Sequence, residues 1–110
     1  MLDATFNALA DPTRRAILAR LALGEATVME LAQPFVMSQP AISKHLKVLE
    51  GAGLIVRRVD GAKRPCNLAK PGLDAADEWL AMLRTALDRN YDRLDQLLAE
   101  LKPGKGEEEL

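Results

Sequence analysis

The feature that most constrains the fold is a short link between two predicted helices in the stretch TVMELAQPFVMSQPAISKHLKVLEG. Thr27 is a good N-cap for the first helix, and Pro34 ends that helix because proline has no N–H to donate. Ser38 caps the second helix, and Pro40 is tolerated in its first turn. Since the linking segment FVMS allows only a tight turn, the sequence predicts a helix-turn-helix pair.

The second helix of this pair, residues 38–51, has two distinct faces. At 100° per residue, Ile42, Leu46 and Leu49 share one side and are expected to point into the core. The N-terminal tip and the other side carry side chains that suit base edges and phosphates. These are Ser38, Gln39, Pro40, Ser43, Lys44 and Lys47, with His45 at the border of the apolar face. A solvated surface for the two lysines, and a packed role for the lone histidine, stay open as alternatives.

Two short strands, LIVRRVD and RPCNLA, are predicted next, joined by GAK in a hairpin with a glycine in its loop. Arg57, Arg58, Lys63 and Arg64 bracket the turn and repel one another unless a polyanion lies alongside. The hairpin is therefore expected to be a basic wing, residues 57–65, that reaches over phosphates or the minor groove. Protection against edge-to-edge aggregation is the alternative. The order of elements predicts a mainly α fold with a small β-hairpin, a winged helix-turn-helix.

The net charge of −1 conceals an uneven distribution. Residues 38–70 contain seven basic and two acidic side chains, whereas residues 71–110 contain five basic and ten acidic ones. Salt screens charges beyond roughly 8–10 Å, so the local basic segment matters more to a nearby polyanion than the distant acids. The overall acidity is weak evidence against DNA binding.

Apolar residues in the last predicted helix, residues 71–101, alternate by three and four, the heptad pattern of a coiled coil. A second apolar stripe runs beside the first. A domain of this size has little core to cover both, so one is expected to bury against a second copy, although wrapping of one small core stays open. The expected dimer interface also uses a short helix at 3–9 and contains Phe6, Leu9, Trp79, Leu80, Leu83, Leu87, Asn90, Tyr91 and Leu94.

Residues 1–101 are predicted to form one domain, and the Pro-, Gly- and Glu-rich residues 102–110 a disordered tail. No stretch reaches the roughly 20 apolar residues of a membrane span, and the N-terminus lacks the pattern of a signal peptide, which predicts a cytoplasmic protein without membrane contact. One Cys and one His cannot build a usual soft-metal site within a protomer. No catalytic constellation is visible, so neither enzymatic activity nor a cofactor is expected.

The segments DPTRRAIL and SQPAISKHLKVLEGAGLI are the most specific parts of a resemblance to the ArsR family of winged-helix bacterial repressors, over residues 4–70. The resemblance implies a homodimer that binds a pseudo-palindromic operator in double-stranded DNA and represses transcription. It implies DNA contacts by Ser38, Gln39, Ser43, Lys44 and His45, with Arg58, Lys63 and Arg64 in the wing. Metal-sensing members carry paired cysteines in the helix before the recognition helix, or Asp and His ligands along the last helix. Here the former has no Cys and the latter has carboxylates but no His, so the chain resembles a non-metal-sensing subgroup.

Two other functions stay open. One is a ligand- or redox-responsive regulator that acts through Cys66 or the dimer helices, although a lone Cys in a strand is more often a small buried residue. The other is a winged-helix module that binds a protein and never reads DNA, for which the acidic C-terminal half gives slight support.

Overall fold

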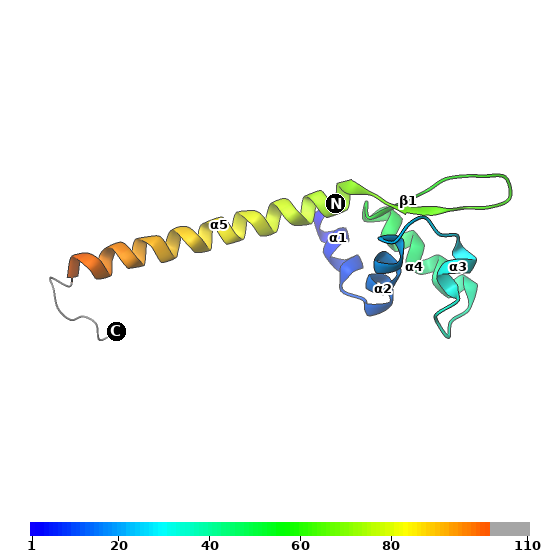
Figure 1. Cartoon of the computed structure of the whole chain (residues 1–110), viewed down its shortest axis with the longest axis horizontal. Helices are drawn as coiled ribbons and strands as arrows, with labels where there is room; N and C mark the ends of the chain where they lie inside the picture. The colour runs from blue at the N-terminus through cyan, green and yellow to red at the C-terminus, as the bar shows by residue number, and fades with distance from the viewer. Residues whose placement is uncertain (102–110) are drawn as a thin grey trace. The chain divides into compact units, whose positions relative to one another are not determined.

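A computed structural model of the chain describes residues 1–101, and the predicted disordered tail lies outside the described residues. The elements in chain order are α1 (Leu2–Leu9), α2 (Pro12–Leu21), α3 (Val28–Ala32), α4 (Gln39–Gly51), β1 (Ile55–Arg57), β2 (Cys66–Leu68) and α5 (Lys70–Leu101) (Figure 1). The chain divides into two compact units, Met1–Asp77 and the part from Glu78 onward. The predicted order of helices and strands is confirmed, with bounds that differ by one to three residues.

The helix starts follow from local capping, which the sequence predicts at Thr27 and Ser38. The Asp11 carboxylate accepts a hydrogen bond from the Arg14 N–H at 3.0 Å, and the Ser38 hydroxyl accepts one from the Ala41 N–H at 3.3 Å. Thr27 and Glu30 form a capping box, in which each side chain accepts a hydrogen bond from the other's backbone N–H. These caps satisfy N–H groups that a helix start leaves without an intrahelical partner.

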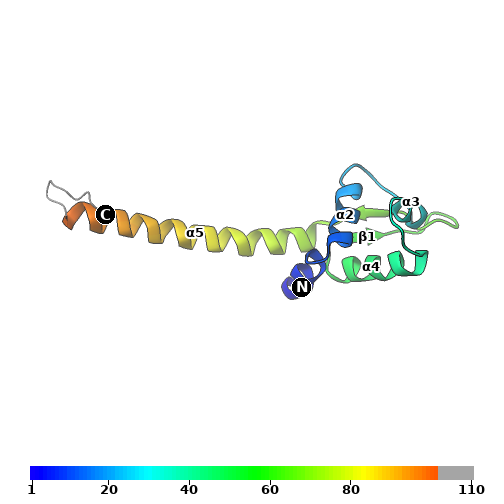
Figure 2. The same ribbon diagram turned by 90° about the horizontal axis from the view of Figure 1, so that it is seen from below.

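The core of the first unit forms around α4, which contacts α1, α2, α3 and β1. Ile42, Leu46 and Leu49 are fully buried, which confirms the predicted apolar face of this helix. Figure 2 shows α4 running alongside the strands and α2. The other buried members of this core cluster are Ala8, Ile17, Leu21, Ala26, Leu31, Ala52, Leu54, Ile55 and Cys66.

The hairpin is antiparallel. Its register pairs Ile55 with Leu68, Val56 with Asn67 and Arg57 with Cys66. An isolated bridge between Ala26 and Cys66 ties the segment before α3 to the other edge of β2. At the tip, Asp60 and Lys63 exchange backbone hydrogen bonds of 3.0 and 3.1 Å across Gly61 and Ala62. Gly61 has a φ of +65°, which a two-residue hairpin turn requires of its first residue.

Helix α5 begins in the first unit, and only Gly72 and Ala76 of its residues are buried. The side chains predicted to form the dimer interface are exposed from Trp79 onward, with Trp79 at 40% and Tyr91 at 58%. From Trp79 to Leu101, no apolar side chain of α5 is buried. None of the helices within residues 1–101 combines the length and the hydropathy of a membrane span.

Candidate nucleic-acid interface

The outer face of α4 carries the side chains that the sequence assigns to DNA. Gln39, Lys44 and Lys47 are exposed, whereas Ser43 is half-buried. Within residues 1–101, neither of these two lysines has an ion-pair partner. Because the opposite side of α4 is locked into the core, this polar face is held in a fixed orientation and its two cations are available to an anion.

His45 lies at the edge of this face and contacts α2. Its Nδ1 is 3.3 Å from the guanidinium of Arg14. Since Arg14 can only donate, Nδ1 is the acceptor in this contact. The same guanidinium donates to the carbonyl oxygens of Ala8 at 2.8 Å and Asn7 at 3.0 Å. Arg14 therefore joins the end of α1 to α4 and orients His45.

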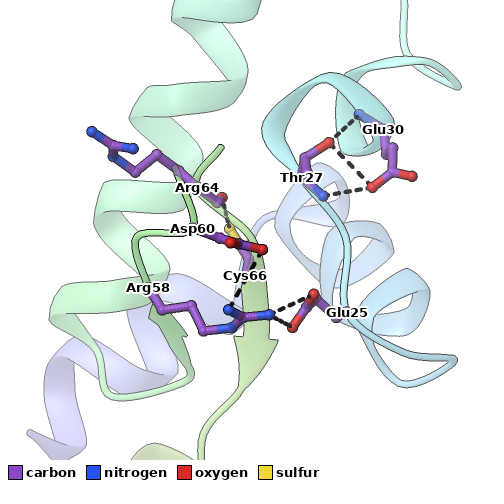
Figure 3. A network of polar contacts seen from close by, with 7 residues as sticks. All are labelled: Glu25, Thr27, Glu30, Arg58, Asp60, Arg64 and Cys66. Atoms are coloured by element: carbon purple, nitrogen blue, oxygen red, sulfur yellow. Dashed lines mark hydrogen bonds and ion pairs between the residues drawn. The ribbon is translucent and has the colours of Figure 1, made fainter. Parts of the chain in front are cut away.

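The wing is less basic at its base than the sequence predicts, because carboxylates from the same chain pair with two of its four cations. Arg57 lies 3.4 Å from Glu50. The Arg58 guanidinium donates two hydrogen bonds to Glu25, at 2.8 and 3.0 Å, and lies 3.9 Å from Asp60 (Figure 3). Glu25 raises the pKa of Arg58 by hydrogen bonding and by its charge.

The free positive charge of the wing is concentrated at its tip. Lys63 is exposed and has no ion-pair partner within the described part of the chain. Arg64 donates to the carbonyl oxygens of Gly61 and Lys63 at 3.3 and 3.0 Å, which leaves its charge without a carboxylate partner there. An open cleft of about 480 Å³ separates this tip from α3, between Ala62–Arg64 on one side and Met29, Glu30 and Gln33 on the other.

Cys66 is fully buried in β2, at the base of the wing. Loss of hydration raises the pKa of its thiol, and the nearby Arg57 only partly opposes that shift. The sulfur lies 3.8 Å from the carbonyl oxygen of Arg64. Cys66 is therefore a small buried residue, as a lone Cys in a strand more often is. Its burial lowers the fraction of the reactive thiolate that the redox-responsive alternative needs.

Sequence patterns do not identify two residues that position side chains of this site, Arg14 and Glu25. Arg14 belongs to a helix with an ordinary amphipathic pattern, and no local signal marks it as a partner of His45, 31 positions away. Glu25 is 33 positions from Arg58. Among the residues that the structure describes, no three His, Cys, Asp or Glu side chains gather in a group that would hold a metal ion.

Residues 11–56 match the family model described as "Bacterial regulatory protein, arsR family". The chain is 43% identical over 106 residues to the HTH-type transcriptional regulator Rv2034 of Mycobacterium tuberculosis, covering 96% of this chain and 92% of that protein. It is 33% identical to the arsenical resistance operon repressor of Staphylococcus xylosus, covering 77% of this chain and 82% of that protein.

A solved structure supports the fold. The structure of this chain is similar to the homodimeric winged helix-turn-helix DNA-binding domain of Mb0332 from Mycobacterium bovis, determined by solution NMR, with a TM-score of 0.59 and 28% sequence identity. The match covers 83% of this chain and 82% of that domain. The predicted winged helix-turn-helix fold is thereby confirmed, with α3 and α4 as the helix pair and the hairpin as the wing.

Proposed function

Because this chain belongs to the arsR family of bacterial regulatory proteins, we propose that it is a homodimeric repressor that binds a specific operator in double-stranded DNA. The observation that carries the proposal is the outer face of α4. Its fully buried Ile42 and Leu46 fix the helix, while Gln39 and Lys44 stay exposed and free to contact bases and phosphates.

The proposed DNA contacts fall into two groups. At the N-terminal tip of α4, the exposed Gln39 suits the adenine edge and Ser43 suits either base, so this group is assigned to sequence reading. Lys63 at the wing tip suits the phosphate backbone, which supplies affinity without sequence information. The full proposed set is Ser38, Gln39, Pro40, Ser43, Lys44, His45 and Lys47 on α4, and Arg58, Lys63 and Arg64 in the wing.

The proposed dimer uses the apolar residues of α5, with α1 as its companion and residues 1–101 as one functional domain. Leu80, Leu83, Leu87 and Leu94 recur at intervals of three, four and seven, and each is between 43% and 51% exposed. Burying such a row against a second copy removes apolar surface from water, which drives association. The homodimeric state of the Mycobacterium bovis domain supports this arrangement. Two α4 helices roughly 34 Å apart would then meet successive major grooves.

We further propose that the protein belongs to a subgroup that senses no metal. Its relative from Staphylococcus xylosus is an arsenical resistance operon repressor, so membership of the family alone does not decide whether this protein senses a metal. The sequence holds one Cys and one His, whereas soft metal ions are usually held by several such ligands. Arsenite, Zn²⁺ or Cd²⁺ added to a protein–operator complex is expected to leave its dissociation constant unchanged, and release of the DNA by any of them would contradict the subgroup.

The experiment that tests the main proposal is selection of bound duplexes from a random DNA pool at near-physiological salt, followed by sequencing. We expect enrichment of a pseudo-palindrome with half-sites about one helical turn apart. Gln39→Ala and Ser43→Ala should relax the preference at defined positions, whereas Lys44→Ala should weaken binding to all sequences alike. Retention that vanishes with modest salt and enriches no motif would contradict the proposal and favour the protein-binding module.

A further inference from the structure

Glu25 lies outside the helix-turn-helix and the hairpin, in the segment between α2 and α3, yet it makes the shortest side-chain contacts of the wing. Both its carboxylate oxygens accept from the same Arg58 nitrogen, at 2.8 and 3.0 Å (Figure 3). The bridge between Ala26 and Cys66 holds this segment beside β2, and the Arg58 N–H donates to Pro65 at 3.1 Å on the other side. The Arg58 side chain thus reaches across the base of the wing to Glu25.

This ion pair is close, but it is also accessible. The Arg58 side chain is 53% exposed and that of Glu25 is 41% exposed. Exposed pairs of this kind contribute little to stability, because water solvates both partners well. A DNA phosphate presents to a guanidinium the same acceptor chemistry as a carboxylate. A phosphate can therefore displace the Glu25 carboxylate from Arg58.

We propose that Glu25 is an intramolecular competitor of DNA for Arg58. In the free protein the carboxylate occupies the guanidinium, and on the operator a backbone phosphate displaces it. This inference rests on the proposed function, because it needs the wing to lie along DNA. Glu25 thereby lowers the affinity of the wing for all sequences equally and makes the selective contacts of α4 a larger share of the total binding free energy.

The competition leaves a signature in salt dependence. Each phosphate contact releases DNA counterions and contributes a slope of about −0.9 to a plot of log K against log salt concentration. When Arg58 leaves Glu25, the freed carboxylate remains beside the wing, and its negative charge offsets part of the positive charge that Arg58 brings to the phosphates. Removing the carboxylate charge should therefore make the slope steeper, by up to about 0.9, in addition to raising affinity.

The test is a double-mutant cycle with Glu25→Gln, Arg58→Ala and both together, measured on the selected duplex and on an unrelated duplex of equal length. Glu25→Gln is expected to raise affinity about 1.5- to 5-fold on both, with a steeper slope. In the Arg58→Ala background the same change should have no effect beyond that of the control. Melting temperatures of all variants establish that each is folded.

Glu30→Gln is the matched control. It removes the same charge from the neighbouring helix α3, and glutamine retains the capping box with Thr27. Its effect on binding measures the general influence of one carboxylate near the wing, and that effect should persist in the Arg58→Ala background.

Weaker binding by Glu25→Gln would overturn the inference and assign Glu25 to holding the wing in place. An effect of Glu25→Gln that is unchanged by Arg58→Ala would overturn it as well. If Lys63→Ala flattens the salt slope while Glu25→Gln does not steepen it, the inference fails and the DNA-binding proposal stands. If no duplex is bound by any variant, both fail.

Discussion

The backbone N–H of Gly72 donates a hydrogen bond of 2.7 Å to the carbonyl oxygen of Gly53, where the first turn of α5 meets the end of α4. A Cβ at Gly72 would lie 2.5 Å from the carbonyl oxygen of Ala52 and 2.9 Å from that of Gly53. Backbone cannot retreat from such a contact as a flexible side chain would. The start of α5 is therefore joined to the DNA-binding unit at a point where only glycine fits.

Gly72→Ala is expected to lower the free energy of unfolding by about 1–3 kcal/mol, the usual cost of overpacking. Gly51→Ala is the control, since a Cβ at Gly51 meets nothing within 4 Å and alanine favours a helix. Chemical denaturation of both variants measures the difference. Equal stability of the two variants would contradict the close packing at Gly72.

Arg14→Ala should destabilise the first unit, because it leaves the carbonyl oxygens of Asn7 and Ala8 without the guanidinium that bonds them. Loss of charged hydrogen bonds of this kind costs about 1.5–3 kcal/mol each when buried, and less here because the site is partly exposed. Arg15→Ala removes a single exposed bond to Leu9 and serves as the comparison. We expect the larger drop in melting temperature for Arg14→Ala.

Acidification should weaken the fold through two helix caps. Backbone hydrogen bonds hold the pKa of Asp11 below 3.8 and that of Glu30 below 4.5, their ordinary values. A lowered pKa in the folded state means that the cap stabilises fully above those ordinary values and loses its contribution as the pH falls through the folded-state pKa. Unfolding measured between pH 6 and 3 should show less loss of stability in Asp11→Asn and Glu30→Gln than in the natural sequence.

The Cys66 thiol is expected to react slowly in the folded protein. Burial raises its pKa, so less thiolate is present at any given pH, and the fully buried sulfur is shielded from reagents. At pH 8 an aromatic disulfide reagent should modify the native chain at least tenfold more slowly than the chain in denaturant. Comparable rates in the two states would revive the redox-responsive alternative.

Lys63→Ala should flatten the dependence of log K on log salt concentration by about 0.9, and weaken binding to operator and unrelated duplexes by the same factor. Lys63 stands at the tip of the wing and forms no ion pair among residues 1–101, although the charge of Glu30 acts on it at longer range, so its ammonium group is available to a phosphate. Titrations at four salt concentrations measure the slope. An unchanged slope would remove the wing tip from the interface.

The elements whose causes are local can be predicted from the order of residues alone. Asp11, Thr27 and Ser38 cap helices because each bonds an N–H three residues ahead, and Ile42, Leu46 and Leu49 are buried because their spacing matches the turn of a helix. The hairpin and its glycine turn follow from the same short-range chemistry.

Which cations of this protein lack an ion-pair partner among residues 1–101 depends on how the elements pack in space. Arg57 and Arg58 have no partner nearby in sequence except Asp60, and the carboxylates of Glu50 and Glu25 reach them only after α4 and the α2–α3 segment pack beside the strands. The contact of Gly53 with Gly72, and that of Arg14 with His45, likewise join elements far apart in the chain. Charge counted along a sequence cannot anticipate such pairs, because an ion pair depends on distance in space.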